Sequence, residues 1–154
     1  MNHFLIDEGL IEVLSRINTL RHSSSKEDWM NCYSVAEEIV ETLFKASNHL
    51  AIYGSLAPGK VNHHVIVDIK GQWLEGNVRG RLHENGWGSG LGFPGIIWDP
   101  DGSKVKVYLF ISKHLPENWK RLDHFEGDGY KRILVPIHNE GGIIAVANIY
   151  EVRR

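Results

Sequence analysis

The chain has 154 residues, enough for one domain with a hydrophobic core and too few for two full-sized ones. Hydrophobic residues make up 42% and charged residues 23%, as in ordinary globular proteins. The net charge is −2 with histidine neutral, so no overall field attracts nucleic acid or an anionic membrane, and we expect neither as a partner.

The N-terminal segment, residues 1–14, carries acidic residues among its apolar ones and lacks a basic start, so it is not a signal peptide. No apolar run approaches the roughly 18 residues that span a bilayer. We therefore expect a cytoplasmic protein. The single cysteine, Cys32, excludes an internal disulfide and a cysteine-based zinc site. Its place on the apolar face of a predicted helix indicates a buried, unreactive thiol.

Residues 1–48 are predicted to be helical. In the first helix, apolar residues recur at helical spacing: Leu10, Ile11, Leu14, Ile17 and Leu20. A capping box starts a second helix, formed either by Ser24 with Glu27 or by Ser25 with Asp28. We expect this helix to bury Trp29, Cys32, Tyr33, Ala36, Ile39, Val40, Leu43 and Phe44, to expose Glu37, Glu38 and Glu41, and to end at Ala46, Ser47 and Asn48.

From residue 49 onward the hydrophobic period changes to two and glycine becomes frequent, since only Gly9 precedes this point and the other 15 glycines follow it. Strands are predicted at residues 49–56, 76–82, 105–109, 133–137 and 143–152. A turn at residues 140–142 joins the last two. Short strands joined by glycine-rich turns favour a small, mainly antiparallel β-barrel.

One helix interrupts the predicted strands. Pro116 suits its first turn, and Gly127 stands where a left-handed residue usually ends a helix. Trp119, Leu122 and Phe125 lie three apart and form one apolar face. The sequence thus predicts a helix with Pro116 in its first turn that ends before Gly127.

Asp123 and Glu126 place two carboxylates near the end of this helix, beside its apolar face. Glu126 also lies at the negative end of the helix dipole. Apolar surface, a second carboxylate and the helix terminus each favour a raised pKa for the Glu126 carboxyl, which suits proton transfer near neutral pH. From the helix alone, the alternative is a solvated acidic helix end that pairs with Lys131 or Arg132.

Two glycine-rich segments are candidates for ligand-binding loops. Residues 53–59 follow a buried strand and can present backbone N–H groups to a carboxylate or a carbonyl oxygen, with a purely structural turn as the alternative. Residues 90–95 formally match a dinucleotide fingerprint, but Pro94 precedes the last glycine and no helical pattern follows. We interpret residues 86–95 as a lid or binding loop.

The histidines and the serine hydroxyl form no specific metal or hydrolase motif. His63 and His64 are expected on extended chain, where neighbours point to opposite faces and rarely bind one ion. A triad of Ser55, Asp123 and a histidine would lack the Gly-x-Ser-x-Gly elbow. We expect no metal and no cofactor.

Several motifs follow one another between Leu50 and Val152, which is about two-thirds of the chain: Tyr53-Gly54-Ser55-Leu56, Gly59, Asn62-His63-His64, Gly76-x-Val78-x-Gly80-x-Leu82, Phe93-Pro94-Gly95, Leu122-Asp123-x-Phe125-Glu126-Gly127, Tyr130-x-Arg132 and the closing strand to Tyr150. In order and spacing they resemble the gamma-glutamylcyclotransferase-like family. The resemblance implies an α+β fold, a small β-barrel with flanking helices, in residues 49–154. Residues 1–48 would be a helical extension packed on the same domain.

The resemblance also implies a site. The loop of Tyr53, Gly54, Ser55 and Leu56 would bind the γ-glutamyl group, Glu126 would be the general acid/base, and Tyr130 would line the cavity. The implied reaction cyclises a γ-glutamyl amine or peptide to 5-oxoproline without metal or cofactor. A barrel that binds a small carboxylate or amide ligand, or a protein partner, without turnover is the alternative function.

Two departures from the family pattern stand out. Val107 occupies a position where glycine is usual, and its side chain would narrow the cavity. The helical extension precedes the point where the family typically begins. It would pack on the barrel, cover its mouth or make a homodimer contact.

Overall fold

The structure is a computed structural model, and it describes residues 3–23, 35–54, 56–60, 62–83 and 95–152. Three α-helices lie in these ranges, α1 (His3–Ser23), α3 (Val35–Phe44) and α4 (Trp119–Glu126). The strands there are β1 (His49–Ile52), β2 (Gln72–His83), β3 (Gly95–Trp98), β4 (Ser103–Ile111), β5 (Tyr130–Asn139) and β6 (Gly142–Val152). Short 3-10 helices are η1 (Ala46–Asn48), η2 (His63–Val65) and η3 (Pro116–Asn118).

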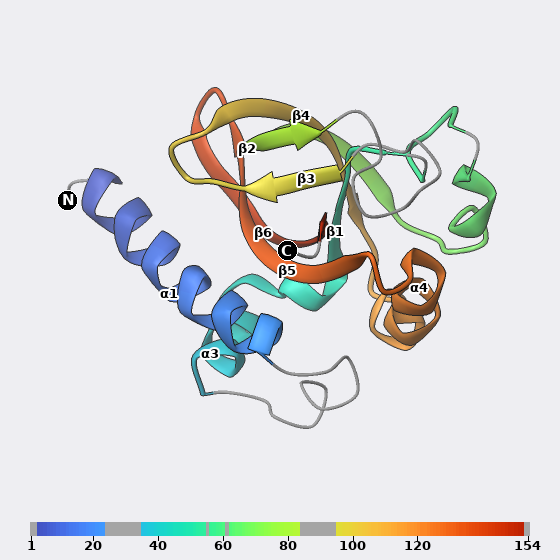
Figure 1. Cartoon of the computed structure of the whole chain (residues 1–154), viewed down its shortest axis with the longest axis horizontal. Coiled ribbons are helices and arrows are strands. Elements are labelled where there is room, and N and C mark those ends of the chain that lie inside the picture. Colours follow the sequence, from blue (N-terminus) through green and yellow to red (C-terminus); the bar gives the residue numbers. More distant parts are fainter. Residues whose placement is uncertain (1–2, 24–34, 55, 61, 84–94, 153–154) are drawn as a thin grey trace.

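Five strands close into a barrel in the order β1, β4, β2, β5 and β6, and β6 pairs back onto β1. The sixth strand, β3, pairs with β2 on one side and β6 on the other. Neighbours are antiparallel except for the pairings of β6 with β1 and β3. With α1 and α3 on one side and α4 on another, the predicted α+β barrel with an N-terminal helical extension is confirmed (Figure 1).

Two glycines of β2 allow this strand to pair with β4 and also with β5 and β3. A Cβ on Gly76 would lie 2.8 Å from the Ile137 side chain of β5, and a Cβ on Gly80 would lie 2.7 Å from the Ile97 carbonyl of β3. Any larger residue would push these strands apart. Gly76 is therefore required where β2 meets β5 in the barrel, and Gly80 is required where β3 pairs with β2.

The extension packs against the barrel through α1. Leu14 and Ile17 are fully buried in the same hydrophobic cluster as Leu134 of β5. Asn18 binds both backbone groups of Leu134: its Nδ2 donates to the carbonyl and its Oδ1 accepts from the N–H, each at 2.8 Å. The amide thus satisfies β5 as a further strand would.

Helix α3 buries a different face from the one that the sequence predicted. Val40 is buried at 3% exposure, but Ile39 and Leu43 are 54% and 69% exposed, so the prediction that both are buried was wrong. Two of the acids expected on the outer face are instead partly buried, because Glu37 pairs with Arg21, and Glu41 accepts hydrogen bonds from Ser47. Ion pairing with the buried Arg21 outweighed the apolar stripe.

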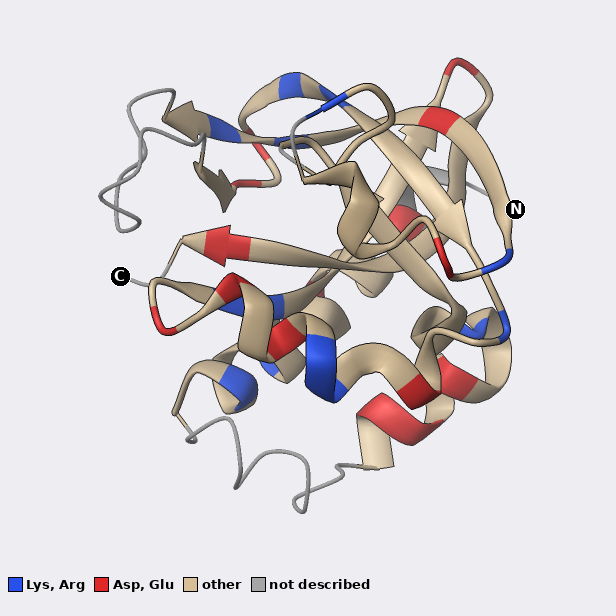
Figure 2. Cartoon of the chain, turned by 90° about the vertical axis from the view of Figure 1, so that its right-hand side faces the viewer, with Lys and Arg blue, Asp and Glu red and all other residues tan. Residues whose placement is uncertain are grey.

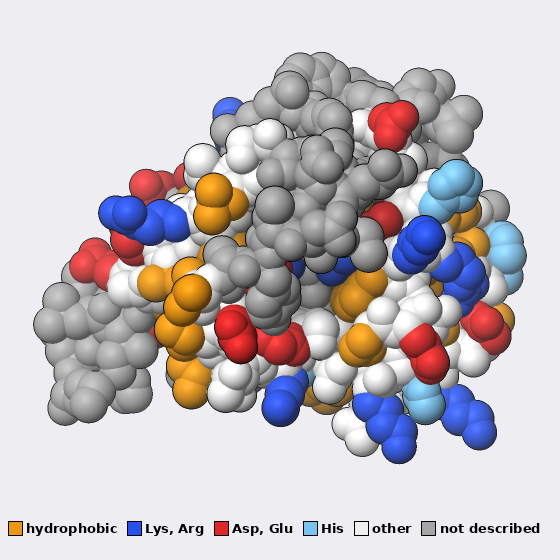
Figure 3. All heavy atoms as spheres, turned by 90° about the horizontal axis from the view of Figure 1, so that it is seen from below, with side chains coloured by type: hydrophobic (Ala, Val, Ile, Leu, Met, Phe, Trp, Pro, Cys, Tyr) orange, Lys and Arg blue, Asp and Glu red, His pale blue; other side chains and the backbone are white. Residues whose placement is uncertain are grey.

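The described surface mixes its side-chain types. Figure 3 shows hydrophobic side chains among polar ones on the side that carries α1 and α3. Lys and Arg are interspersed with Asp and Glu over the face in Figure 2. No helix in the described ranges combines the length and apolar character that a bilayer span requires.

Three local features differ from the predictions or lie outside them. Strand β3 begins at Gly95, where no strand was predicted, and it confirms that no helix follows the glycine-rich segment. His63 and His64 lie in η2 and not on extended chain. Cys32, the capping-box residues and the rest of the glycine-rich segment, residues 86–94, lie outside the described ranges.

Candidate active site

The end of α4 forms as predicted. Gly127 has φ of +79°, and its N–H donates to the Asp123 carbonyl at 3.1 Å. This left-handed position favours glycine and stops the helix directly after Glu126. Trp119 and Leu122 are buried, whereas Phe125 is 42% exposed, so Phe125 does not belong to the buried face.

Asp123 and Glu126 have different surroundings despite their spacing. Asp123 is buried, and its two oxygens accept Nε and Nη2 of Arg132 at 2.8 and 3.2 Å. The Tyr150 hydroxyl donates to the same carboxylate at 2.7 Å. Arg132, one of the two partners considered for Glu126, thus forms a bidentate pair with Asp123. Glu126 is only partly buried.

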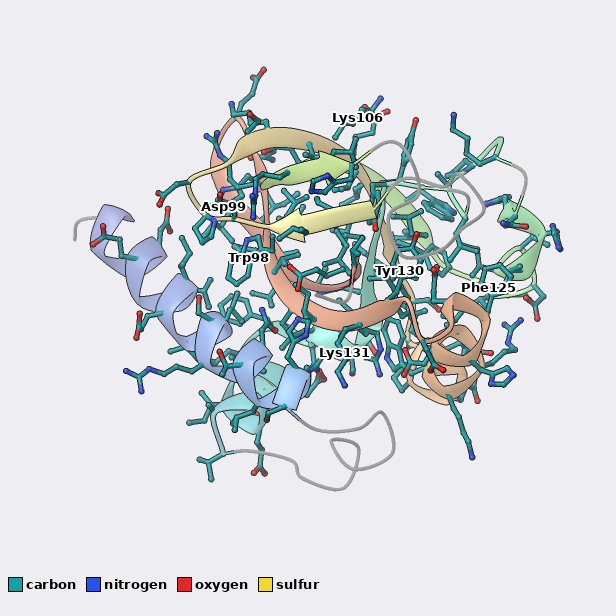
Figure 4. All side chains as sticks on the ribbon, in the orientation of Figure 1. Trp98, Asp99, Lys106, Phe125, Tyr130 and Lys131 are labelled. Carbon is teal, nitrogen blue, oxygen red and sulfur yellow. The ribbon has the colours of Figure 1, made fainter. Side chains whose placement is uncertain are left out.

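Tyr53 and Tyr150 converge with Tyr130 at one end of the barrel. Strands β1 and β6 run parallel, with Leu50 beside Asn148, and β5 is antiparallel to β6, with Arg132 opposite Tyr150. The carboxyl ends of β1 and β6 therefore meet the start of β5. Tyr130 is buried in the same cluster as Tyr150, and Figure 4 shows it on the side where α4 lies.

The Tyr53 hydroxyl donates to the Tyr150 carbonyl at 2.7 Å and accepts the Ile96 N–H at 3.2 Å. Burial raises the pKa of Tyr53 well above its usual range, the Ile96 N–H opposes the shift, and the charges of Tyr130 and Glu126 add to it. Tyr53 therefore remains a neutral hydrogen-bond donor in the physiological range.

The charge of Glu126 also affects the pKa of Tyr150. Burial is the main cause that raises the pKa of Tyr150, while Arg132 lowers it and Asp123 and Glu126 raise it further. The Glu126 carboxylate thus lies within electrostatic range of hydroxyls at the ends of β1 and β6.

The loop after β1 is held by local hydrogen bonds. The Ala57 N–H donates to the Gly54 carbonyl at 3.0 Å, which closes a turn. Leu56 is buried, and its carbonyl lies 2.9 Å from Nδ1 of His63. Ser55 lies outside the described residues. His63 thus fixes the end of the Tyr53–Leu56 loop, a role that its spacing from the loop did not reveal.

Val107 lies fully buried in the barrel core, opposite Gly76 in the β2–β4 pairing. It belongs to the hydrophobic cluster against which Tyr53 packs. Within the described residues, no three His, Cys, Asp or Glu side chains gather in an arrangement able to hold a metal ion. The arrangement offers one partly buried carboxylate, tyrosine hydroxyls and a backbone loop, which suit proton transfer and hydrogen bonding.

Sequence reasoning missed the roles of Tyr150 and Arg132 at this site. Tyr150 was predicted only as the end of a strand, and Arg132 only as part of a motif and as a partner for Glu126. Both side chains lie on β-strands and reach Asp123 of α4 through the barrel wall. No local pattern signals this, because the contact joins residues 27 positions apart in the case of Tyr150.

Residues 50–154 match the model of a family described as gamma-glutamyl cyclotransferase, AIG2-like. The chain belongs to this family. The match covers the barrel strands and α4 almost completely, and α1 and α3 lie outside it. No curated protein matches the sequence.

Solved structures share the fold at low sequence identity. An AIG2-like protein from Mus musculus is 19% identical with a TM-score of 0.51, and the match covers 68% of this chain and 76% of that chain. YkqA from Bacillus subtilis is 22% identical with a TM-score of 0.52, covering 68% of this chain and 35% of that chain. The uropathogenic E. coli-specific protein c4763 is 19% identical with a TM-score of 0.50, covering 68% and 79%. These likenesses show the fold.

Proposed function

We propose that the protein is a cyclotransferase that converts a γ-glutamyl amine or γ-glutamyl peptide into 5-oxoproline and the free amine. The observation that carries the proposal is the end of α4, where Glu126 is partly buried and follows the fixed Asp123 by three residues, on the side of the barrel where Tyr130 lies. Membership of the gamma-glutamyl cyclotransferase, AIG2-like family supports it.

The reaction needs only groups that this end of the barrel offers. The neutral α-amine of the substrate attacks its own γ-carbonyl carbon, and a C–N bond closes the five-membered lactam. The C–N bond to the leaving amine then breaks. One proton leaves the attacking nitrogen and one reaches the departing nitrogen, so a single carboxylate can serve as base and then as acid.

Each element has a part in this scheme. The loop of Tyr53, Gly54, Ser55 and Leu56 binds the γ-glutamyl group and places its amine against its carbonyl, which removes much of the entropic barrier. Backbone N–H groups of the loop stabilise the developing oxyanion. Tyr130 lines the cavity, and Glu126 transfers the proton.

Tyr53 is a hydrogen-bonding residue in this mechanism and not the base. Its hydroxyl is held between Ile96 and the Tyr150 carbonyl, and its raised pKa keeps it protonated. Because a phenol with a raised pKa is a poor proton acceptor near neutral pH, the carboxylate of Glu126 is the group suited to the transfer.

Glu126→Gln tests the mechanism. Gln keeps the size and the hydrogen-bonding capacity of Glu but cannot carry the proton, so release of 5-oxoproline from a panel of γ-glutamyl amines and dipeptides should fall by roughly 10²- to 10⁴-fold. Glu117→Gln is the matched control, because Glu117 lies in η3 with a side chain 69% exposed and should leave turnover unchanged.

The outcomes separate the two functions considered. Turnover by the wild type that persists in Glu126→Gln would contradict the assigned role. A wild type that binds γ-glutamyl compounds in calorimetry, but releases no 5-oxoproline from any of them, would favour the binding barrel.

A further inference from the structure

Two buried arginines share one amide oxygen between the extension and the barrel. Nη1 of Arg21, in the last turn of α1, lies 3.0 Å from Oδ1 of Asn148, and Nη1 of Arg132 lies 2.9 Å from the same oxygen. Nδ2 of Asn148 donates to the Ala46 carbonyl at 2.9 Å. The amide is therefore oriented with its oxygen toward both guanidinium groups.

Each guanidinium has its own carboxylate. Nε of Arg21 donates to Oε1 of Glu37 at 3.0 Å, and its Nη2 also contacts that oxygen. Arg132 binds Asp123 through two nitrogens. Burial lowers the pKa of Arg21 and the charge of Arg132 lowers it further, whereas Glu37 raises it. The four charges are thus balanced as two pairs joined by Asn148.

The second pair lies against the helix that carries Glu126. The guanidinium of Arg132 stacks over the Trp119 ring at 4.2 Å and donates hydrogen bonds to the Asp123 carboxylate. It therefore contacts α4 at two residues that are one helical turn apart. Asp123 precedes Glu126 by three residues, which is less than one helical turn. A shift of Arg132 would therefore tilt or translate the end of α4.

The connection from α1 to α4 is continuous and consists of buried side chains. Arg21, Asn148, Arg132 and Asp123 are all buried at 6% exposure or less. A second contact holds the same geometry, since Nη1 of Arg21 lies 3.3 Å from the Arg132 carbonyl. Arg21 therefore contacts both the backbone of β5 at Arg132 and the amide that orients the Arg132 side chain.

We propose that Arg21 is a positioning residue, and that the N-terminal helices set the orientation of α4, and with it Glu126, through Asn148 and Arg132. The consequence for turnover rests on the proposed function, but the positioning of α4 does not. Because the family match begins at residue 50, Arg21 and Glu37 are contributions of the extension of this chain.

Hydrogen exchange of the full chain tests the positioning without reference to activity. Arg21→Met removes the charge and all the donors but keeps an unbranched side chain. We expect amide exchange in residues 119–126 to become at least about tenfold faster. Ile17→Ala is the matched control, because Ile17 is buried in the same helix but lies outside the polar chain of contacts. It destabilises the packing of α1 and should affect residues 119–126 much less.

Glu37→Gln provides a milder second variant in case Arg21→Met does not fold. It keeps the shape of Glu37 but leaves the charge of Arg21 uncompensated beside Arg132, so exchange in residues 119–126 should again become faster. If exchange there changes no more in either variant than in Ile17→Ala at equal loss of stability, the positioning role is wrong.

Turnover gives the second readout. In a wild type that releases 5-oxoproline, Arg21→Met and Glu37→Gln should lower kcat by about tenfold or more with KM within about twofold, because a misplaced proton carrier slows chemistry more than binding. Arg16→Gln, with a side chain 79% exposed on the same helix, should leave both constants unchanged. An unchanged kcat in Arg21→Met alongside normal exchange overturns the inference, and a wild type without turnover overturns only the proposed function.

Discussion

Asp123 and Glu126 are two carboxylates on one short helix with opposite surroundings. Asp123 is buried, bound by two nitrogens of Arg132 and by the Tyr150 hydroxyl. Glu126 is partly buried at the helix end, where the chain turns at Gly127. The first is fixed as part of a charge-balanced structure, and the second is the group that we propose for proton transfer.

The difference shows that two acids three residues apart on one helix can have very different surroundings. The bidentate pair with Arg132 and the hydrogen bond from Tyr150 hold the buried Asp123 carboxylate in one place, which suits a structural role. That rigidity fixes the frame from which Glu126 extends, and preorganised catalytic groups depend on such support. The two acids are therefore expected to respond to substitution in opposite ways.

Among substitutions of polar groups, the largest effect on stability should come from Asp123→Asn. Asn keeps the size of Asp but removes the charge that balances the buried Arg132, so the free energy of unfolding should fall by about 3 kcal/mol. Glu126→Gln should change it by less than about 0.5 kcal/mol. Urea denaturation of both variants measures the contrast. Equal losses in the two variants would remove the distinction between the acids.

Tyr150→Phe should cause the next largest loss in the free energy of unfolding. It deletes the hydroxyl that donates to Asp123 at 2.7 Å and leaves the ion pair with Arg132 in place. Hydrogen bonds to charged groups contribute roughly 1.5–3 kcal/mol, so a loss of about 2 kcal/mol is expected in urea denaturation. A double variant with Asp123→Asn should lose less than the sum of the single losses, since the two groups share one interaction. Additive losses would show that the hydroxyl does not support Asp123.

The pH dependence of the free energy of unfolding should reveal the raised pKa of the Tyr53 hydroxyl. The pKa of Tyr53 is raised in the folded state. The contribution of its hydroxyl to the free energy of unfolding is therefore complete below the pKa of tyrosine in the unfolded chain, about 10, and is lost as the pH rises above that value. Between pH 8 and pH 11, the unfolding free energy of the wild type should fall by about 1.4 kcal/mol more than that of Tyr53→Phe. Parallel pH profiles for the two proteins would show that the Tyr53 hydroxyl is not protected by folding.

The smallest effect should come from Phe125→Ser, on the open side of α4. Phe125 is 42% exposed, so its replacement should change the free energy of unfolding by less than about 0.5 kcal/mol. Leu122→Ala, one turn earlier and fully buried, should lose about 2–5 kcal/mol. Thermal unfolding compares the two variants directly. A large loss in Phe125→Ser would place that ring in the core after all.

Much of the fold could be predicted from the sequence because its signals are local. The alternation around Val78 and Val107 and the stop at Gly127 each act within a few residues. Strand β3 was missed because four buried residues after a glycine-rich segment carry no alternation. The burial of α3 was predicted wrongly because its apolar stripe was taken as the inner face, whereas Glu37 pairs with Arg21.

The candidate site likewise has features that the sequence predicted and features that only the tertiary structure shows. The motifs from Tyr53 to Glu126 pointed to the residues of the site, and each motif is a short stretch of chain. Which acid pairs with Arg132, and that Arg21 shares Asn148 with it, depends on α1, β5, β6 and α4 meeting in space.

The sequence by itself determined the barrel, the helix that ends at Glu126 and the family, because periodicity, glycine positions and ordered motifs are properties of neighbouring residues. Only the tertiary structure decided that Asp123 is a structural acid and that the N-terminal extension contacts the same buried charges. The physical reason is that a buried charge must find its counter-charge wherever the fold places one, and that partner lies 9 positions away for Asp123 and 16 positions away for Arg21, which pairs with Glu37.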